Sequence, residues 1–301
     1  MHRGARSAPR ARPAPAGPAS RLRHYSGMTP DGCAREPVSE PEAIPERLTL
    51  GTDMPALIWR ATGDGRPRPA VVTLHGGGQS KTVVGPATVK RVVSAGVTLV
   101  AVDMYLHGDH VDEAASSLDV SYATMLEIVV HTAQELQRVV ADLKKDPAIK
   151  PNSIAVRGES LGAYAALTAL GLGVPFCLGL SVAGAADYET TLTHALRASR
   201  ASDEEISRER ARLRERIREF DPLLRVEQIA PRPVMMIHGI ADEEVPIDAH
   251  RALYAALAPH YTAAPENCVF VTHAGGHATP DAIDAAGWNW LLKRVGDTWS
   301  D

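Results

Sequence analysis

Residues 154–170 read IAVRGESLGAYAALTAL, and this stretch decides the fold. A short apolar run leads into GESLG at residues 158–162, and an alanine-rich helical stretch follows at once. A strand, a G-x-S-x-G motif and a helix in this order predict a sharp turn that leaves the hydroxyl of Ser160 exposed. The flanking glycines leave space where a side chain would collide with the neighbouring strand and helix. We therefore predict that Ser160 is a nucleophile.

Short β-branched runs alternate with helical stretches on both sides of this turn, as in parallel strands joined by crossover helices. Because the runs are almost continuously apolar, we expect a sheet covered on both faces. The predicted fold class is therefore α/β, a doubly wound and mostly parallel sheet of about eight strands. We expect an opening hairpin and six further strands at residues 48–50, 56–61, 70–74, 97–103, 154–157, 176–182, 234–238 and 268–272. Helical periodicity marks residues 85–94, 122–145, 161–170, 248–257 and 281–295.

One segment interrupts the alternation between the sixth and seventh strands. Residues 188–220 form a long stretch with high helix propensity and many charges. It is either a solvated helix pair on the surface or a lid over the active site, and its position favours a helical cap insertion.

The first part of the chain has a different composition. Residues 1–27 are rich in Arg, Ala and Pro, carry six arginines and contain no acidic residue. We expect residues 1–46 to form a disordered basic tail and linker, and residues 47–301 to form the folded domain. Met28 is an equally plausible start of the protein, which would remove the tail.

Composition and charge limit the partners. A net charge of -4 leaves no overall basic surface, so we expect small-molecule partners and no nucleic acid. No run approaches the roughly 18 apolar residues of a membrane span. Three widely spaced cysteines form no C-x-x-C pair, which argues against a disulfide framework or a zinc knuckle and fits a reducing cytoplasm. The three cysteines are Cys33, Cys177 and Cys268. The oligomeric state is left open.

A serine hydroxyl is a weak nucleophile at neutral pH and requires a base and an orienting carboxylate. Asp242 follows the strand at residues 234–238, and His277 follows the strand at residues 268–272. The loops at the carboxyl ends of parallel strands line one crevice, so Ser160, Asp242 and His277 can converge there. The order Ser, Asp, His is that of α/β-hydrolases.

Neighbouring residues offer alternatives for both roles. Glu243 and Glu244 could supply the carboxylate, but the spacing to the following Val-Pro pair favours Asp242. His273 could supply the base, but the paired glycines before His277 give that residue a flexible approach to the serine. We interpret His238, at the end of its strand, as a packed or hydrogen-bonded residue.

The sequence HGGG at residues 75–78 follows the third strand, where hydrolases place one half of the oxyanion hole. We expect the N–H groups of Gly77 and Leu161 to be the two donors. The loop matches neither phosphate-binding glycine pattern. Residues 103–110 read DMYLHGDH, but no second cluster with ligand spacing accompanies them, so we expect no metal site and no cofactor.

Taken in order, these motifs resemble the α/β-hydrolase superfamily over residues 47–297. Within it, the chain is most similar to bacterial dienelactone-hydrolase and prolyl-oligopeptidase-related serine esterases, which share the HG loop, a D-x-x-x-H-G segment and an HG-x-x-D-x-x-V-P segment. Dienelactone hydrolases carry a cysteine at the position of Ser160. The resemblance implies esterase chemistry on small acyl esters.

The expected activity is a carboxylesterase that cleaves small acyl esters through an acyl-enzyme. The same three residues would serve a thioesterase or an amidase, because the pocket selects the leaving group. The fold also permits a non-catalytic ligand-binding protein, although an intact set of three residues argues against it.

Overall fold

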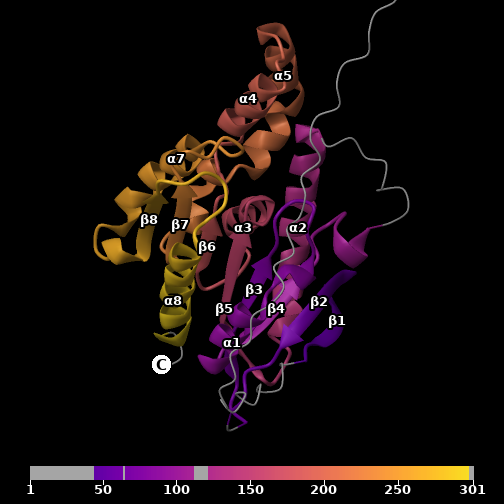
Figure 1. The fold of residues 1–301 in the computed structure, drawn as a ribbon, viewed down its shortest axis with the longest axis vertical. Helices are drawn as coiled ribbons and strands as arrows, with labels where there is room; N and C mark the ends of the chain where they lie inside the picture. Colours follow the sequence, from indigo (N-terminus) through magenta and orange to yellow (C-terminus); the bar gives the residue numbers. More distant parts are fainter. Residues whose placement is uncertain (1–43, 64, 112–120, 298–301) are drawn as a thin grey trace, which may run out of the picture. The chain divides into compact units, whose positions relative to one another are not determined.

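The strands of the computed structural model form one sheet in the order β1-β2-β4-β3-β5-β6-β7-β8 (Figure 1). The structure describes residues 44–63, 65–111 and 121–297. β2 pairs antiparallel with β1 and with β4, and all other neighbouring strands pair parallel. The predicted α/β fold with an opening hairpin is confirmed. The strands are β1 (Glu46–Leu50), β2 (Met54–Trp59), β3 (Arg68–Leu74), β4 (Thr98–Val102), β5 (Ile149–Glu159), β6 (Gly179–Val182), β7 (Val234–Gly239) and β8 (Cys268–His273).

Helices cover both faces of the sheet because alternate strand residues point to opposite sides. Val72 and Val156 pack in one buried cluster with α2, α3 and α7, whereas Val71 and Ala155 pack in another with α1 and α8. Each strand therefore needs apolar residues on both sides, which explains its continuous apolar run. The helices are α1 (Pro86–Ser94), α2 (Tyr122–Leu143), α3 (Leu161–Gly171), α4 (Tyr188–Ala198), α5 (Asp203–Phe220), α6 (Val226–Ile229), α7 (Ile247–Leu257) and α8 (Asp281–Asp297).

Two strands differ most from their predicted bounds. β5 begins at Ile149, five residues earlier than expected, because Ile149 pairs with Arg68 before a register shift brings Ile154 opposite Ala70. The sequence Lys-Pro-Asn at residues 150–152 hides this continuation, because it is typical of a turn. β6 begins only at Gly179, although the apolar run starts at residue 176.

The strand order reverses between β3 and β5. The chain passes from β3 to β4 on one side and then returns to place β5 on the other side of β3. In open α/β sheets a crevice forms outside the carboxyl ends of the strands at such a reversal. The HGGG loop follows β3 and Ser160 follows β5, so the topology brings these two motifs together.

The segment predicted as a cap insertion forms α4 and α5, which lie at the top of the view in Figure 1. Asp221 ties the beginning of the cap to its end. Its carboxylate accepts hydrogen bonds from the N–H groups of Asp187 (3.0 Å), Tyr188 (2.7 Å) and Leu223 (2.9 Å). Burial raises the pKa of this carboxyl group.

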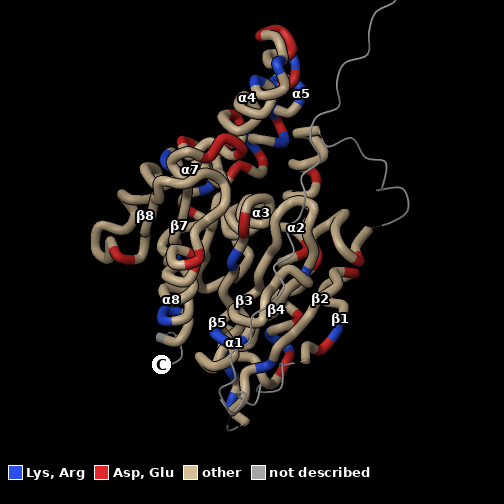
Figure 2. Tube along the Cα trace, in the orientation of Figure 1, with Lys and Arg blue, Asp and Glu red and all other residues tan. Residues whose placement is uncertain are grey.

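Most of the charges in the cap lie on α5, where acidic and basic residues alternate along the helix (Figure 2). Its apolar side chains, by contrast, share one face and are buried against α2, α3 and α4. The amphipathic pattern of the sequence thus places one face of α5 inward and leaves the charged face in solvent. The inward side chains are Ile206, Leu213, Ile217 and Phe220.

Two sequence expectations concern other parts of the chain. The proposed disordered tail at residues 1–46 lies almost wholly outside the described residues, which begin at Ile44. Among the helices that are described, none combines the length and the apolar character needed to cross a bilayer.

The turn between β5 and α3 depends on two glycines. A Cβ atom on Gly158 would overlap the carbonyl oxygen of Gly162. A Cβ atom on Gly162 would lie 2.5 Å from the carbonyl oxygen of His75 and 2.6 Å from that of Leu74. Because backbone atoms cannot move aside easily, the contact between α3 and the end of β3 requires glycine at both positions.

We expect Gly162→Ala to lower the free energy of unfolding by about 3 kcal/mol or more, because the added methyl group meets two backbone carbonyls. Urea unfolding measures the change. Gly296→Ala is the matched control, since a Cβ atom there has no heavy atom within 4 Å and alanine favours the helix. Equal stability of the two variants would contradict the close contact.

Candidate active site

Ser160 occupies the tip of the turn in a strained backbone conformation. Its φ is 50° and its ψ is -119°, in a region that non-glycine residues rarely adopt. The N–H of Ser160 donates to the carbonyl of Val182 at the end of β6 (2.8 Å), and its carbonyl accepts from Ala163 in α3 (2.9 Å). Strain of this kind costs about 1–3 kcal/mol and persists only where the surroundings enforce it. Here it directs the hydroxyl away from both elements.

His277 lies between Ser160 and Asp242 and contacts both. Its Nε2 atom is 2.9 Å from Ser160 Oγ, and its Nδ1 atom is 2.9 Å from Asp242 Oδ2. The loop after β8 carries His277 and the loop after β7 carries Asp242. The structure thus brings the three residues expected from the sequence into one hydrogen-bonded row. Such a row can move a proton from the serine to the imidazole.

The Asp242 carboxylate is buried and held from several directions. Its Oδ1 atom accepts hydrogen bonds from the N–H groups of Glu244 (3.0 Å) and Val245 (2.9 Å). Its Oδ2 atom faces His277 and lies 3.2 Å from Nε2 of His238. These donors hold in place a carboxylate that has no exposed side-chain surface.

The residues considered as alternatives to Asp242 and His277 lie outside this hydrogen-bonded row. The Glu244 side chain is 74% exposed, and its carboxylate is 3.9 Å from Nε2 of His277, beyond hydrogen-bonding distance. Glu243 contributes its carbonyl oxygen, which accepts a hydrogen bond from His194 in α4 (2.8 Å). His273 ends β8, where its Nδ1 atom accepts from the N–H of Gly275 (3.2 Å).

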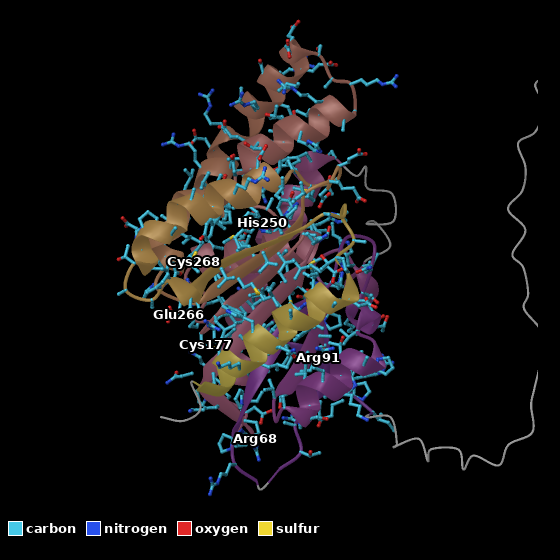
Figure 3. All side chains as sticks on the ribbon, turned by 60° about the vertical axis from the view of Figure 1, so that its left-hand side comes forward. Arg68, Arg91, Cys177, His250, Glu266 and Cys268 are labelled. Carbon is cyan, nitrogen blue, oxygen red and sulfur yellow. The ribbon has the colours of Figure 1, made fainter. Side chains whose placement is uncertain are left out.

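A chain of buried polar side chains continues behind Asp242. Nδ1 of His238 is 2.7 Å from Nδ1 of His250 in α7, and Nε2 of His250 is 2.8 Å from Oγ of Ser181 in β6. All three side chains are buried. The contact with Ser181 of β6 places the His250 side chain on the side of α7 that faces the sheet, and Figure 3 labels this residue.

The hydrogen-bond partners determine which ring nitrogens of His238 and His250 carry a proton. Nε2 of His238 faces two acceptors, Asp242 Oδ2 and the carbonyl of Val245 (3.0 Å), so it carries a proton. Nδ1 of His238 then accepts from Nδ1–H of His250, whose Nε2 accepts from the Ser181 hydroxyl. Burial lowers the pKa of His238 and lowers that of His250 well below its usual value, so both rings are neutral.

Sequence reasoning found His238 as a packed residue but missed His250 and Ser181. His250 is three residues before Leu253 on the buried face of α7, and this spacing is the signal that could have revealed it. The partners of Ser181 give no sequence signal, because the pairing joins residues 69 positions apart.

The HGGG loop lies against the nucleophile turn. The N–H of Gly76 already donates to Oε1 of Gln79 (3.0 Å). Among the described residues, we find no acceptor for the N–H of Gly77 or for that of Leu161. The Cβ position of Gly77 is 3.7 Å from Cδ2 of Leu161, so the two free donors come from neighbouring backbones. This arrangement can bind an oxyanion.

His75 fixes the shape of this loop. Its Nδ1–H donates to the carbonyl of Gly76 (2.8 Å), and its Nε2 accepts from the N–H of Met104 (3.2 Å). Burial lowers the pKa of His75, so the ring remains neutral and can act as donor and acceptor at once.

The loop at residues 103–110 is built around Asp103. Oδ1 of Asp103 accepts from the N–H of Lys81 (2.7 Å), and Oδ2 accepts from Lys81 Nζ (2.5 Å) and from the N–H of Asp109 (2.8 Å). Gly108, at φ 56°, brings its backbone against this carboxylate. In the described ranges, no group of three His, Cys, Asp or Glu side chains could hold a metal ion.

A sequence profile of the prolyl oligopeptidase family matches residues 123–290, more than half of the chain. The chain belongs to the prolyl oligopeptidase family. This family of serine hydrolases confirms the resemblance found in the sequence. The matched region contains Ser160, Asp242 and His277 and begins after the HGGG loop.

Individual relatives agree with the family assignment. The chain is 26% identical over 228 residues to the esterase YjfP of Escherichia coli, covering 73% of this chain and 87% of YjfP. Two solved structures share the fold: TT1662 of Thermus thermophilus (TM-score 0.64, 20% identity, 83% and 97% coverage) and acetyl xylan esterase 1 of a Thermoanaerobacterium species (TM-score 0.65, 17% identity, 86% of each chain).

The neutral histidines predict how stability depends on pH. Below about pH 6.5 the unfolded chain protonates His238 and His250, whereas burial opposes their protonation in the folded protein, most strongly for His250. Unfolding therefore takes up protons, and its free energy falls with decreasing pH by up to about 1.4 kcal/mol per pH unit for each histidine. Urea unfolding from about pH 7.5 to about pH 5.5 measures this slope.

His250→Asn should lower this slope by up to about 1.4 kcal/mol per pH unit, the contribution of one proton. Asparagine keeps a donor towards His238 but does not titrate. His260→Asn, which removes an exposed histidine, is the control and should keep the slope of the unaltered protein. An unchanged slope in His250→Asn would mean that His250 is protonated in the folded state.

Proposed function

We propose that the protein is a carboxylesterase that cleaves small acyl esters, with Ser160 as nucleophile, His277 as general base and Asp242 as the orienting carboxylate. The row of 2.9 Å contacts from Ser160 Oγ through His277 to Asp242 carries the proposal. The similarity to the esterase YjfP, most of whose length the chain covers, supports ester bonds as the substrate class.

The first step forms an acyl-enzyme. Ser160 Oγ attacks the ester carbonyl while its proton passes to Nε2 of His277, and the Asp242 carboxylate stabilises the resulting imidazolium. The negative charge on the carbonyl oxygen is bound by the N–H groups of Gly77 and Leu161. His277 then gives its proton to the leaving alcohol as the carbonyl re-forms.

Water completes the cycle. His277 removes a proton from a water molecule, which attacks the acyl-enzyme through a second tetrahedral intermediate at the same two donors. Collapse of this intermediate returns the proton to Ser160 Oγ and releases the acid. The His277 side chain is 22% exposed, which gives water access to the imidazole.

The backbone supplies much of the transition-state stabilisation in this scheme. One oxyanion-hole donor typically contributes about 2.7–4 kcal/mol, and here both donors are held before substrate arrives. Gly77 is positioned by the hydrogen bonds of Gly76 to Gln79 and His75. Leu161 is positioned as the first residue of α3.

We expect Ser160→Ala and Asp242→Asn to lower kcat for p-nitrophenyl acetate by about 10⁴-fold or more, because each breaks the proton transfer from serine to imidazole. Steady-state kinetics measure kcat, and labelling with a fluorophosphonate followed by peptide mapping identifies the nucleophile. Ser199→Ala, which alters an exposed serine in the cap, is the control and should keep full activity.

Modification at a residue other than Ser160, or ester hydrolysis that survives in Ser160→Ala, would reject this assignment. Thioester and anilide substrates with the same acetyl group test the other bond types. A faster reaction with either of them would replace the ester as the preferred bond.

A further inference from the structure

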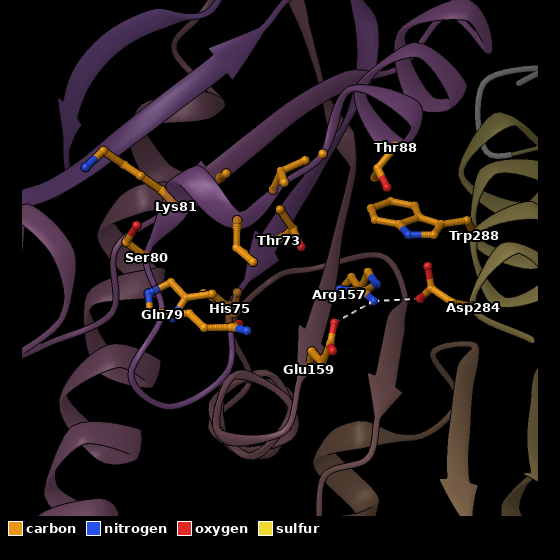
Figure 4. A pocket seen from close by; sticks show the side chains of 15 residues that line it. Thr73, His75, Gln79, Ser80, Lys81, Thr88, Arg157, Glu159, Asp284 and Trp288 are labelled. Atoms are coloured by element: carbon orange, nitrogen blue, oxygen red, sulfur yellow. Dashed lines mark hydrogen bonds and ion pairs between the residues drawn. The ribbon is translucent and has the colours of Figure 1, made fainter. Parts of the chain in front are cut away.

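A polar cavity of about 130 Å³ lies on the side of the sheet that α1 and α8 cover (Figure 4). Residues of β3, β5 and both helices line it. The reaction scheme above assigns no role to the cavity. Hydrogen-bonding side chains in its lining include Thr73, Gln79, Thr88, Arg157, Glu159 and Asp284.

The cavity adjoins the nucleophile. Glu159 lines it and directly precedes Ser160 in the chain. Gln79 lines it as well, and a Cβ atom on Gly76 would lie 3.2 Å from Gln79 Oε1 and 3.6 Å from Ser160 Cβ. Both side chains are therefore close to the same point in space. A molecule bound in the cavity would therefore lie next to the nucleophile turn.

Arg157 is the central polar group of the cavity. It is 7% exposed, and its Nη2 atom donates to Asp284 Oδ1 (2.7 Å) and Glu159 Oε2 (3.1 Å). Its guanidinium carbon lies 5.1 Å from the ring centre of Trp288. Its buried Nε atom has no hydrogen-bond partner among the described residues. A buried N–H without an acceptor costs about 1–3 kcal/mol, so this guanidinium keeps an unused donor.

The charges around Arg157 disfavour an anionic ligand. The carboxylates of Glu159 and Asp284 already offset the guanidinium charge. Lys81, which also lines the cavity, directs its ammonium group to Asp103 and Asp109 (2.5 and 2.7 Å). An anion would therefore find no uncompensated positive charge, and an apolar acyl chain would leave the polar groups without partners.

Hydroxyl groups match this lining. Each can accept a hydrogen bond from Arg157 and donate one to a carboxylate or to the Gln79 amide oxygen. The threonines at positions 73 and 88 add two groups that donate and accept. The volume is below the roughly 300–1,000 Å³ of sites for whole drug-sized ligands, so the cavity fits one small part of a molecule.

We propose that this cavity binds the alcohol part of the substrate, and that this part is a small polyol with the size of glycerol. The proposal rests on the esterase function proposed above. The ester carbonyl would lie at Ser160 and the free hydroxyl groups would enter the cavity towards Arg157. The site would thus distinguish esters by their alcohol and not by their acyl group.

Two acetate esters of equal carbon number test the proposal. In 1-monoacetylglycerol and propyl acetate the acyl group and the alcohol chain length are the same, but only the first has free hydroxyl groups. We expect kcat/KM for monoacetylglycerol to exceed that for propyl acetate at least about tenfold, the effect of one or two hydrogen bonds. Equal values, or a stronger preference for the cationic ester acetylcholine, would overturn the polyol subsite.

Variants locate the preference in the cavity. Arg157→Lys keeps the charge but loses the planar donor set, and Thr88→Val removes one hydroxyl group at similar volume. Each should reduce the ratio of the two kcat/KM values by about threefold or more. Arg294→Lys is the matched control, because Arg294 also stacks on a tryptophan of α8, Trp290, but does not line the cavity, and it should keep the ratio.

The outcomes separate the two proposals. Absence of hydrolysis of both acetates would reject the esterase function itself. Hydrolysis of both that depends on Ser160, with a ratio near one or with the same ratio in all variants, would reject only the subsite.

Discussion

The close contact between α3 and the ends of β3 and β5 determines the geometry of the whole site. Gly162 lets the helix approach the carbonyls of Leu74 and His75, and Gly158 lets the strand approach the helix. At this distance the chain turns sharply and holds Ser160 at a positive φ. The same contact puts the first N–H of α3 beside the HGGG loop. Nucleophile and oxyanion donors are thus consequences of one packing constraint.

Much of this arrangement could be predicted from the sequence because it depends on local signals. The five helices expected outside the cap begin and end within two residues of their expected bounds, since apolar periodicity, a capping serine or a nearby glycine marks each one. The places of Ser160, Asp242 and His277 follow from the rule that carboxyl ends of parallel strands share one edge. The start of β5 is harder to predict. Its first residues pair with β3 before a register shift, and the sequence at that shift is typical of a turn.

Contacts between distant elements could not be predicted. Nothing near His250 indicates that it meets His238, and nothing near Arg157 indicates that it reaches Asp284 in α8. In both cases a polar side chain is buried because another element, far along the chain, supplies its partner. Composition and periodicity describe one element at a time, so they place such residues on a face but cannot name the partner.

The row of neutral rings behind Asp242 limits the path of the catalytic proton. The assigned tautomers leave no ring nitrogen of His238 or His250 free to take up another proton without breaking a hydrogen bond. The buried side chains behind Asp242 therefore offer no path for a proton from Ser160. Only the partly exposed side of His277 gives a proton access to solvent or substrate. In the proposed scheme, a proton that leaves the serine therefore stays on His277 until it passes to the departing alcohol.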